Sequence, residues 1–261
     1  MRNDKQIVVL KFGSSVLRSD EDLPVAVQEI QHWRRRGKSV VAVVSAFGNT
    51  TDELTRRARR VSDQPNDRLF AALLATGEAT ASALLGLALD RAGVETTVLD
   101  VVQADLRTVG RPLDAELVKV DIGRLTDSLQ KSVVVLPGFV GRDQNDETTL
   151  LGRGGSDLTA LFLAHRLGAD CRLIKDVDGL YTCDPNSATG RTPERYERVS
   201  YQSALRVGGV VVQPKAIEFA QSRRLRFAIS SIASNVATEV GPFQDYIAGT
   251  QLLETVEECA A

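Results

Sequence analysis

Residues 11–15, K-F-G-S-S, place a lysine, a glycine and two hydroxyl side chains at the end of an apolar run. Successive backbone N–H groups in such a turn can form a concave site for an anion, and the lysine adds a full positive charge. The spacing lacks the G-x-x-x-x-G-K-[ST] pattern of a phosphate-binding loop. A small-residue turn with a surface lysine explains this segment as well as an anion site does.

Two further segments place polar groups where a ligand could use them. Residues 45–52, S-A-F-G-N-T-T-D, open a helical stretch with N-caps and free N–H groups, which suit an anion but also simple helix capping. Glu78 stands among the apolar and small residues of 69–89. A bare buried carboxylate is costly, so Glu78 must face a ligand or form an internal ion pair with an arginine.

Residues 152–157, G-R-G-G-S-D, form the most informative segment. Its three glycines permit close approach of another group to the backbone, and Ser156 can cap the helical stretch that follows. Arg153 offers a fork for a carboxylate, while Asp157 offers an acceptor for an ammonium group. Because an α-amino acid carries both groups, this segment predicts an amino-acid site.

Residues 175–186, K-D-V-D-G-L-Y-T-C-D-P-N, combine carboxylates at the end of an apolar run with an aromatic side chain. That combination suits the ribose and adenine of a nucleotide. Acidic residues before Gly and Pro also arise in ordinary turns, so this segment predicts a nucleotide site only together with the other four.

Short apolar runs alternate with helical patterns along the chain, and this order predicts the elements that bring the five segments together. Most runs are apolar on both faces, as in parallel strands covered by helices on either side. We expect an α/β fold, a three-layer α/β/α sandwich with a mostly parallel central sheet and ligands at the carboxyl ends of its strands. The expected strands are 7–12, 39–45, 96–101, 132–139, 171–177 and 225–230, and the expected helices are 22–36, 51–61, 66–91, 114–130, 156–167 and 214–223.

Three local features can also be predicted. Gly37, Gly93 and Gly168 follow helical stretches, where a left-handed C-cap is wanted. Residues 69–89 fit a buried helix pair in a soluble core better than a bilayer helix. The polar stretch 142–149 fits either a hinge or a hairpin turn.

Composition narrows the function classes. Of 261 residues, 43% are hydrophobic and 25% are charged, which is typical of a globular protein with a core. The net charge of -2 and the isolated basic run at 34–36 argue against a nucleic-acid partner. Cys171, Cys183 and Cys259 form no C-x-x-C pair, and the first residues lack an apolar signal segment. We therefore expect reduced thiols, no membrane partner and a cytoplasmic location.

Taken in this order, the segments resemble the amino-acid kinase superfamily, and the catalytic domain of aspartokinase most closely. The similarity runs from Lys11 to about Thr250 and includes V-V-S-A-F-G-N-T-T-D-E-L, L-L-A-T-G-E, P-G-F-V-G-R-D, T-L-L-G-R-G-G-S-D-L-T-A, D-V-D-G-L-Y-T-C-D-P and S-Y-Q-S-A-L. The resemblance implies the amino-acid kinase fold as one catalytic domain over 1–261. Its amino-acid-binding lobe would cover about 1–140 and its nucleotide-binding lobe about 141–261. Typical aspartokinases continue into ACT regulatory domains, and we expect none here; a segment of an aspartokinase fused to homoserine dehydrogenase is an alternative.

The resemblance also implies roles for individual residues. Lys11 would bridge the transferring phosphoryl group and form the catalytic pair with Asp157, while Arg153 would bind a substrate carboxylate and the acidic residues would lie near its ammonium. The implied substrate-binding residues are Ser45, Thr51, Glu78, Arg153 and Ser156, and the implied nucleotide-binding residues are Lys11, Gly13, Ser14, Ser15, Lys175, Asp176, Tyr181 and Asp184. ATP and Mg²⁺ are the implied cofactors, with the metal travelling on the nucleotide and no protein metal site. The implied partners are L-aspartate, ATP and a second copy of the chain in a homodimer.

The implied reaction moves the γ-phosphate of ATP to the side-chain carboxylate of L-aspartate. Its product, 4-phospho-L-aspartate, opens the biosynthesis of lysine, threonine and methionine. A carboxylate with a pKa of about 3.9 is already ionised at neutral pH, so no general base is needed. His32 and His165 lie in helical stretches beside arginines, where we expect structural or exposed roles.

Two alternatives stay open. The K-F-G-S-S loop looks more like that of glutamate 5-kinase than the usual K-F-G-G-T-S, which favours glutamate or a related amino acid as acceptor. The other alternative is a non-catalytic relative that binds a nucleotide or an amino acid and regulates a partner. It is motivated by Asn186 and Val210, which replace family cations, and by Lys175, which replaces a threonine.

Overall fold

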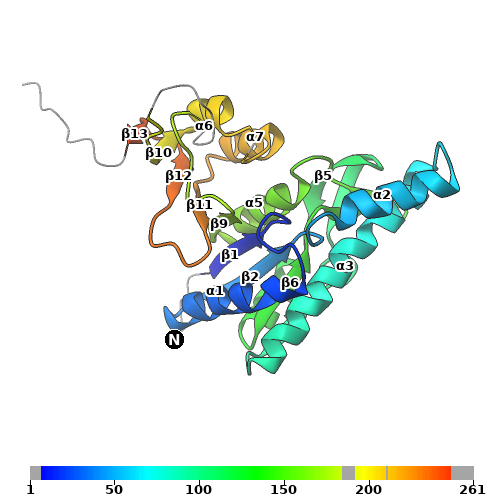
Figure 1. The fold of residues 1–261 in the computed structure, drawn as a ribbon. Helices are drawn as coiled ribbons and strands as arrows, with labels where there is room; N and C mark the ends of the chain where they lie inside the picture. The colour runs from blue at the N-terminus through cyan, green and yellow to red at the C-terminus, as the bar shows by residue number, and fades with distance from the viewer. Residues whose placement is uncertain (1–6, 184–191, 210, 248–261) are drawn as a thin grey trace, which may run out of the picture.

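The computed structural model describes residues 7–183, 192–209 and 211–247. Within them the main sheet contains β1 (Ile7–Phe12), β2 (Ser39–Val44), β3 (Thr96–Val98), β6 (Val133–Pro137), β9 (Asp170–Lys175), β10 (Tyr196–Ser200), β11 (Phe227–Ser231), β12 (Thr238–Gly241) and β13 (Tyr246–Ile247). The strand order is β13-β10-β12-β11-β9-β1-β2-β6-β3 (Figure 1). Neighbouring strands from β11 to β3 are all parallel, and antiparallel pairs occur only beyond β11.

Helices cover both faces of this sheet, because alternate residues of each central strand point to opposite layers. Val8 and Leu10 pack with α1 and α3, whereas Val9 packs with α4, α5 and α7. The helices are α1 (Leu23–Arg35), α2 (Thr50–Val61), α3 (Asp67–Arg91), α4 (Ile122–Leu129), α5 (Gly155–Leu167), α6 (Tyr201–Val207) and α7 (Pro214–Ser222), with a short 3₁₀ turn at Asp20–Asp22. The prediction of a three-layer α/β/α sandwich is therefore confirmed.

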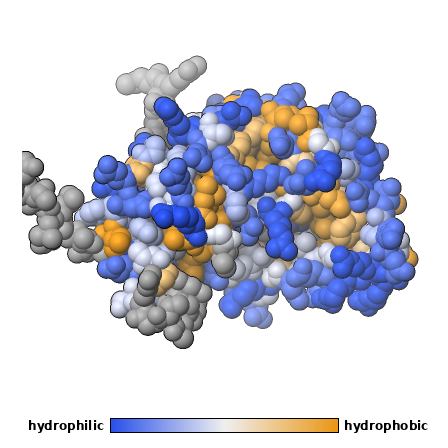
Figure 2. Space-filling model, turned by 90° about the horizontal axis from the view of Figure 1, so that it is seen from above, coloured by the Kyte–Doolittle hydropathy of each residue, from blue (hydrophilic) through white to orange (hydrophobic). Residues whose placement is uncertain are grey.

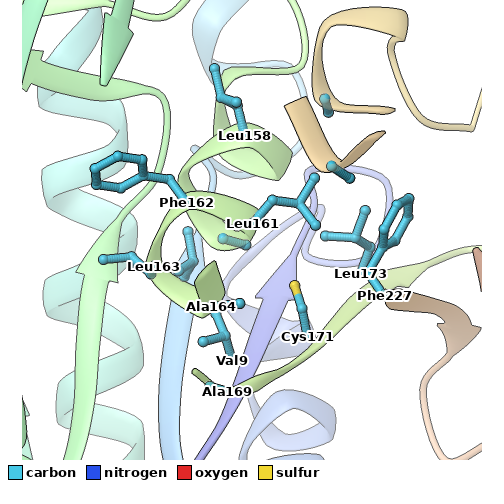
Figure 3. Close-up of a cluster of buried hydrophobic side chains, with 14 of the residues drawn as sticks. Val9, Leu158, Leu161, Phe162, Leu163, Ala164, Ala169, Cys171, Leu173 and Phe227 are labelled. Carbon is cyan, nitrogen blue, oxygen red and sulfur yellow. The ribbon is translucent and has the colours of Figure 1, made fainter. Parts of the chain in front are cut away.

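The larger of the two central cores lies between α5 and the middle of the sheet. Figure 3 shows Leu161 of α5 above the strands, together with Val9 of β1 and Cys171 and Leu173 of β9. All four side chains are at most 3% exposed. This packing fixes the first turn of α5 over the carboxyl ends of β1 and β9.

A second, smaller sheet lies beside the cavity that is described below. It contains β4 (Arg107–Arg111), β5 (Asp114–Lys119), β7 (Val140–Arg142) and β8 (Thr148–Leu150), in the order β5-β4-β7-β8. The prediction of a helix over 114–130 is wrong for its first half, where D-A-E-L-V-K forms β5. Ala115 and Leu117 are buried and their neighbours are exposed, which is the two-residue period of a strand.

The antiparallel β7–β8 pair makes the stretch 142–149 a hairpin turn, one of the two readings of that segment. The three glycines that were predicted as left-handed C-caps have positive φ angles of 78° at Gly37, 70° at Gly93 and 61° at Gly168. Those three predictions are confirmed. In each case glycine is favoured because it pays no Cβ penalty in this conformation.

Helix α3 is one continuous helix of 25 residues, so the prediction of a helix pair is wrong. The Asn66 side chain caps it by accepting hydrogen bonds from the backbone N–H groups of Arg68 and Leu69. Among the described residues, α3 alone is long and apolar enough to cross a membrane, a test that core helices of soluble proteins also pass. Here it contacts α1, α2, β6 and β8.

Candidate functional site

A cavity of about 480 Å³ opens at the carboxyl ends of the central strands. All five polar segments contribute residues to its lining, as expected for an open parallel sheet. The last of them contributes Lys175 but none of the acidic turn that follows it. The predicted site residues that line it are Lys11, Ser14, Ser45, Thr51, Glu78, Arg153, Ser156, Asp157 and Lys175. The structure thus gathers the predicted amino-acid residues and both predicted lysines around one space.

Two lysines share one carboxylate at the floor of this cavity. The Nζ of Lys11 lies 2.8 Å from Oδ1 of Asp157, and the Nζ of Lys175 lies 2.7 Å from Oδ2. The three residues are between 3% and 9% exposed. Two cations and one anion leave this buried cluster with a net positive charge, which suits a ligand with negative charge.

The elements explain how the cluster forms. Lys11 belongs to β1 and Lys175 ends β9, and these two strands are parallel neighbours in which Lys11 pairs with Leu173. Asp157 lies in the first turn of α5, which packs on both strands. The acid therefore meets the lysines from the layer above the sheet.

Burial and charge act against each other in this cluster. Burial by itself raises the pKa of Asp157, but Lys11 and Lys175 outweigh it and hold that pKa below its ordinary value. Burial, helped by the neighbouring charge of Lys11, lowers the pKa of Lys175 to about 8, although Asp157 opposes this change. Asp157 is therefore ionised at neutral pH, and Lys175 gives up its proton more readily than an ordinary lysine.

The glycine-rich turn before α5 has two left-handed residues, Gly152 with φ of 73° and Gly154 with φ of 75°. The prediction that Ser156 caps this helix is wrong. The N-cap position is occupied by Gly154, and no side chain accepts a capping hydrogen bond there. Ser156 is instead buried against Gly138: a Cβ added at Gly138 would lie 2.6 Å from the Cβ of Ser156. Arg153 is exposed at the cavity wall, and its guanidinium has no hydrogen-bond or ion-pair partner among the described residues.

Glu78 faces the cavity from the middle of α3 and is 2% exposed. Its Oε1 accepts a hydrogen bond of 3.2 Å from the backbone N–H of Ala46, while its Oε2 has no hydrogen-bond partner among the described residues. Burial raises the pKa of Glu78 to about 7. The internal ion pair with an arginine that was the alternative for Glu78 does not occur within the described part of the chain.

Four other predicted nucleotide residues are not part of the cavity lining: Gly13, Ser15, Asp176 and Tyr181. A Cβ at Gly13 would stand 3.0 Å from Nζ of Lys11, so that glycine lies directly against the lysine. The Ser15 hydroxyl donates to Asp176 over 3.1 Å and joins the turns after β1 and β9. The Tyr181 hydroxyl donates to Asp178 over 2.8 Å. Asp184, Asn186 and Val210 lie outside the described residues.

Sequence reasoning missed an apolar wall of the cavity formed by Phe70, Leu74, Leu113, Phe139, Leu150 and Val211. Three of these residues could have been found from the sequence. Phe70, Leu74 and Glu78 follow one another at intervals of four, which places them on one face of a helix. Phe139 follows β6, whose carboxyl end is where ligands of such sheets gather.

No group of three or more His, Cys, Asp or Glu side chains that could hold a metal ion occurs within residues 7–183, 192–209 and 211–247.

Comparisons with known proteins agree with this architecture. Aspartokinase 2 of Bacillus subtilis (strain 168) is 37% identical over 240 residues, which cover 90% of this chain and 58% of that protein. The structure of aspartate kinase from Synechocystis superposes with a TM-score of 0.80 at 30% identity and covers 95% of this chain and 41% of that one. The chain therefore spans about half the length of these relatives.

A more distant structure shares the fold. E. coli aspartokinase III, in complex with aspartate and ADP, superposes with a TM-score of 0.76 at 21% identity and covers 91% of this chain and 65% of that one. The model of the Amino acid kinase family matches residues 6–230, which is most of the chain. With the fold, the cavity at the strand ends and this match in agreement, the chain belongs to the amino acid kinase family.

Proposed function

We propose that this chain transfers the γ-phosphate of ATP to the side-chain carboxylate of L-aspartate, giving ADP and 4-phospho-L-aspartate. The buried Lys11–Asp157–Lys175 cluster beside Glu78 in one cavity is the observation that carries the proposal. The similarity to aspartokinases over 90% of the chain supports the choice of acceptor. The reaction would take place in the cytoplasm, as the first step toward lysine, threonine and methionine.

The chemistry asks for alignment and charge neutralisation rather than for a base. The acceptor carboxylate is ionised at neutral pH and can attack the phosphorus directly, while the bond to the leaving oxygen of ADP breaks. In this proposal the ammonium groups of Lys11 and Lys175 offset the negative charge on the transferring group. Asp157 holds both lysines in place and is not a proton acceptor, since it is already bonded to two cations.

The proposal gives each end of the amino acid a partner. The free guanidinium of Arg153 suits a carboxylate, and the unpaired Oε2 of Glu78 suits the ammonium group. Ser45 and Thr51 supply hydroxyl groups at the same cavity wall. Magnesium, brought by ATP, would neutralise phosphate charge.

The organisation of the two substrates and the assembly remain part of the proposal. We assign the amino-acid lobe to about 1–140 and the nucleotide lobe to about 141–261, with Gly13, Ser14, Ser15, Asp176, Tyr181 and Asp184 on the nucleotide side. We also propose a homodimer. Light scattering during size exclusion at micromolar concentration checks this, and a monomer across the accessible range would contradict it.

Trapping the acyl phosphate with hydroxylamine tests the reaction. Wild-type protein with MgATP and L-aspartate should form the hydroxamate. Lys11→Ala should lower the rate by roughly 10³-fold because a phosphate-facing cation is lost. Lys131→Ala, an exposed lysine at the end of α4, is the matched control and should leave the rate unchanged.

A comparison of amino-acid acceptors distinguishes the proposed function from the two alternatives. L-aspartate, L-glutamate and other amino acids are compared under the same conditions. Faster hydroxamate formation with L-glutamate would replace the acceptor in this proposal. If folded protein that still binds ATP forms no product with any acceptor, the result would favour the alternative of a non-catalytic relative.

A further inference from the structure

Lys215 lies in the first turn of α7, outside the residues that line the cavity. Its ammonium group has three N–H donors, and three oxygens surround it. Nζ lies 2.7 Å from Oδ1 of Asp114, 2.9 Å from the carbonyl oxygen of Leu151 and 3.2 Å from that of Ala115. All three donors are therefore used within the protein, and none is left for a phosphate.

These contacts meet at the glycine-rich turn that carries Arg153. Leu151 immediately precedes Gly152, so one hydrogen bond fixes the backbone where the turn begins. The carboxylate of Asp114 lies against the same turn, since a Cβ at Gly152 would stand 2.5 Å from Oδ1. The ion pair with Lys215 holds that carboxylate in position.

The other side of the turn rests on the same helix. A Cβ at Gly154 would stand 2.6 Å from Cβ of Gln213, the residue at the N-cap of α7. The turn is thus held between the tip of β5 on one side and the start of α7 on the other. Glycines have the greatest conformational freedom in the unfolded chain, so a turn built on them needs such external fixation to hold one shape.

We propose that Lys215 is a positioning residue, which fixes the turn 152–154 and thereby the backbone from which the Arg153 side chain extends at the cavity wall. It acts through Leu151 and Asp114 and touches neither substrate. The identity of the acceptor rests on the proposed function, whereas the fixation of the turn does not. Loss of Lys215 would let the backbone of the turn shift and carry Arg153 away from its place at the cavity wall, which weakens binding of the acceptor carboxylate.

The test compares Lys215→Met with Lys119→Met. Lys119 is a matched control, because it is on the same strand as Asp114 and pairs with Asp105 over 2.7 Å, away from the turn. In Lys215→Met we expect the KM for L-aspartate to rise at least tenfold, while kcat and the KM for ATP stay within twofold. Lys119→Met should keep all three values. Lys215→Arg, which keeps a cation and several donors, should recover part of the loss.

Amide hydrogen exchange followed by mass spectrometry gives a second readout that needs no activity. Peptides covering 151–158 should exchange about tenfold faster in Lys215→Met than in wild type or in Lys119→Met. Should Lys215→Met fail to fold, Asp114→Asn removes the charge of the partner and is expected to speed the same exchange.

The outcomes separate the two proposals. An unchanged KM and unchanged exchange in Lys215→Met would overturn the positioning role, and so would equal effects in Lys119→Met. If wild-type protein forms no hydroxamate, the proposed function fails, and the exchange of 151–158 still decides for or against Lys215.

Discussion

Lys175 has a lower pKa than an ordinary lysine because it is buried beside Lys11, and Asp157 restores only part of the difference. Its pKa of about 8 is close to physiological pH. As the pH rises past 8, Lys175 loses its proton and the cluster loses its net positive charge. At neutral pH Lys175 therefore still carries its proton, as its role in the proposed function requires.

The pH dependence of phosphoryl transfer tests this arrangement. In wild type, kcat/KM for MgATP should fall as the pH rises through about 8, since that constant reports groups of the free enzyme. Lys175→Met should be about 100-fold slower at pH 7 and should show no such fall between pH 7 and 9. Initial rates across this range measure both. A fall of equal size in Lys175→Met would assign the titration to another group.

The buried carboxyl group of Glu78 lowers the stability of the folded protein near neutral pH. Its pKa is raised from 4.5 to about 7, so between these pH values the unfolded chain is ionised at this residue while the folded chain is not. Stability is therefore lost as the pH rises from 4.5 to 7, by an amount on the order of 3 kcal/mol. A buried acid with one unpaired oxygen is what a cationic ligand can use.

Glu78→Gln should keep the hydrogen bond from Ala46 and remove this cost. We expect nearly equal melting temperatures for wild type and Glu78→Gln at pH 4.5, and a variant that melts several degrees higher at pH 8. The same variant should bind L-aspartate more weakly, because the negative charge opposite the ammonium is gone. Calorimetric scans at the two pH values measure the first effect. A variant less stable than wild type at pH 8 would contradict the assignment.

At the scale of elements, the start of α5 depends on a contact that only glycine permits. Gly154 has φ of 75° and lies against Gln213, whereas Gly168 at the other end of the helix has φ of 61° and open space around it. Both substitutions by alanine incur the left-handed penalty of about 1–2 kcal/mol. Only the first also forces the turn and α7 apart.

Gly154→Ala should therefore lower kcat/KM for L-aspartate at least tenfold, beyond its effect on stability. Gly168→Ala should lose about 1 kcal/mol of stability and keep its activity. Urea unfolding and initial rates on the same preparations separate the two effects. Equal activities in the two variants would show that the turn tolerates displacement.

Much of this arrangement could be predicted from the sequence, because hydrophobic runs with two apolar faces identify the central strands. Lys11 and Glu78 followed from their places at a strand end and in an apolar helix. The pairing of Asp157 with two lysines did not follow, since it depends on which strands are neighbours and β1 lies between β2 and β9. Strand β5 was taken as helix because D-A-E-L-V-K is short and its residues also suit a helix.

At the scale of the whole molecule, Figure 2 shows hydrophobic patches between mostly hydrophilic residues on one face. The cluster of Lys11, Asp157 and Lys175 is buried at the carboxyl ends of two central strands. A ligand that joins the segments around the cavity should stabilise the entire fold. At one hundred times its Kd, a ligand adds about 2.7 kcal/mol. For a chain of this size that corresponds to a rise of roughly 5–10 °C in Tm.

Thermal unfolding with MgATP at about one hundred times its Kd should show this rise. Chelation of magnesium by EDTA should remove most of it, because the metal neutralises phosphate charge on the bound nucleotide in the proposed reaction. Lys11→Ala removes a buried ion-pair partner and should melt at a lower temperature without ligand; measured against its own ligand-free Tm, it should gain less than wild type from MgATP. An unchanged Tm with MgATP in wild type would argue against nucleotide binding.

The parallel pairing of β1 with β9 also has a consequence for biogenesis. Lys11 is synthesised early, but its neighbours in the cluster come from α5 and from the end of β9. A nascent chain therefore cannot assemble this charge cluster until residues through Lys175 have emerged from the ribosome. Pairings this distant in sequence also form slowly, so recovery of activity after dilution from denaturant would report completion of the sheet centre rather than early collapse.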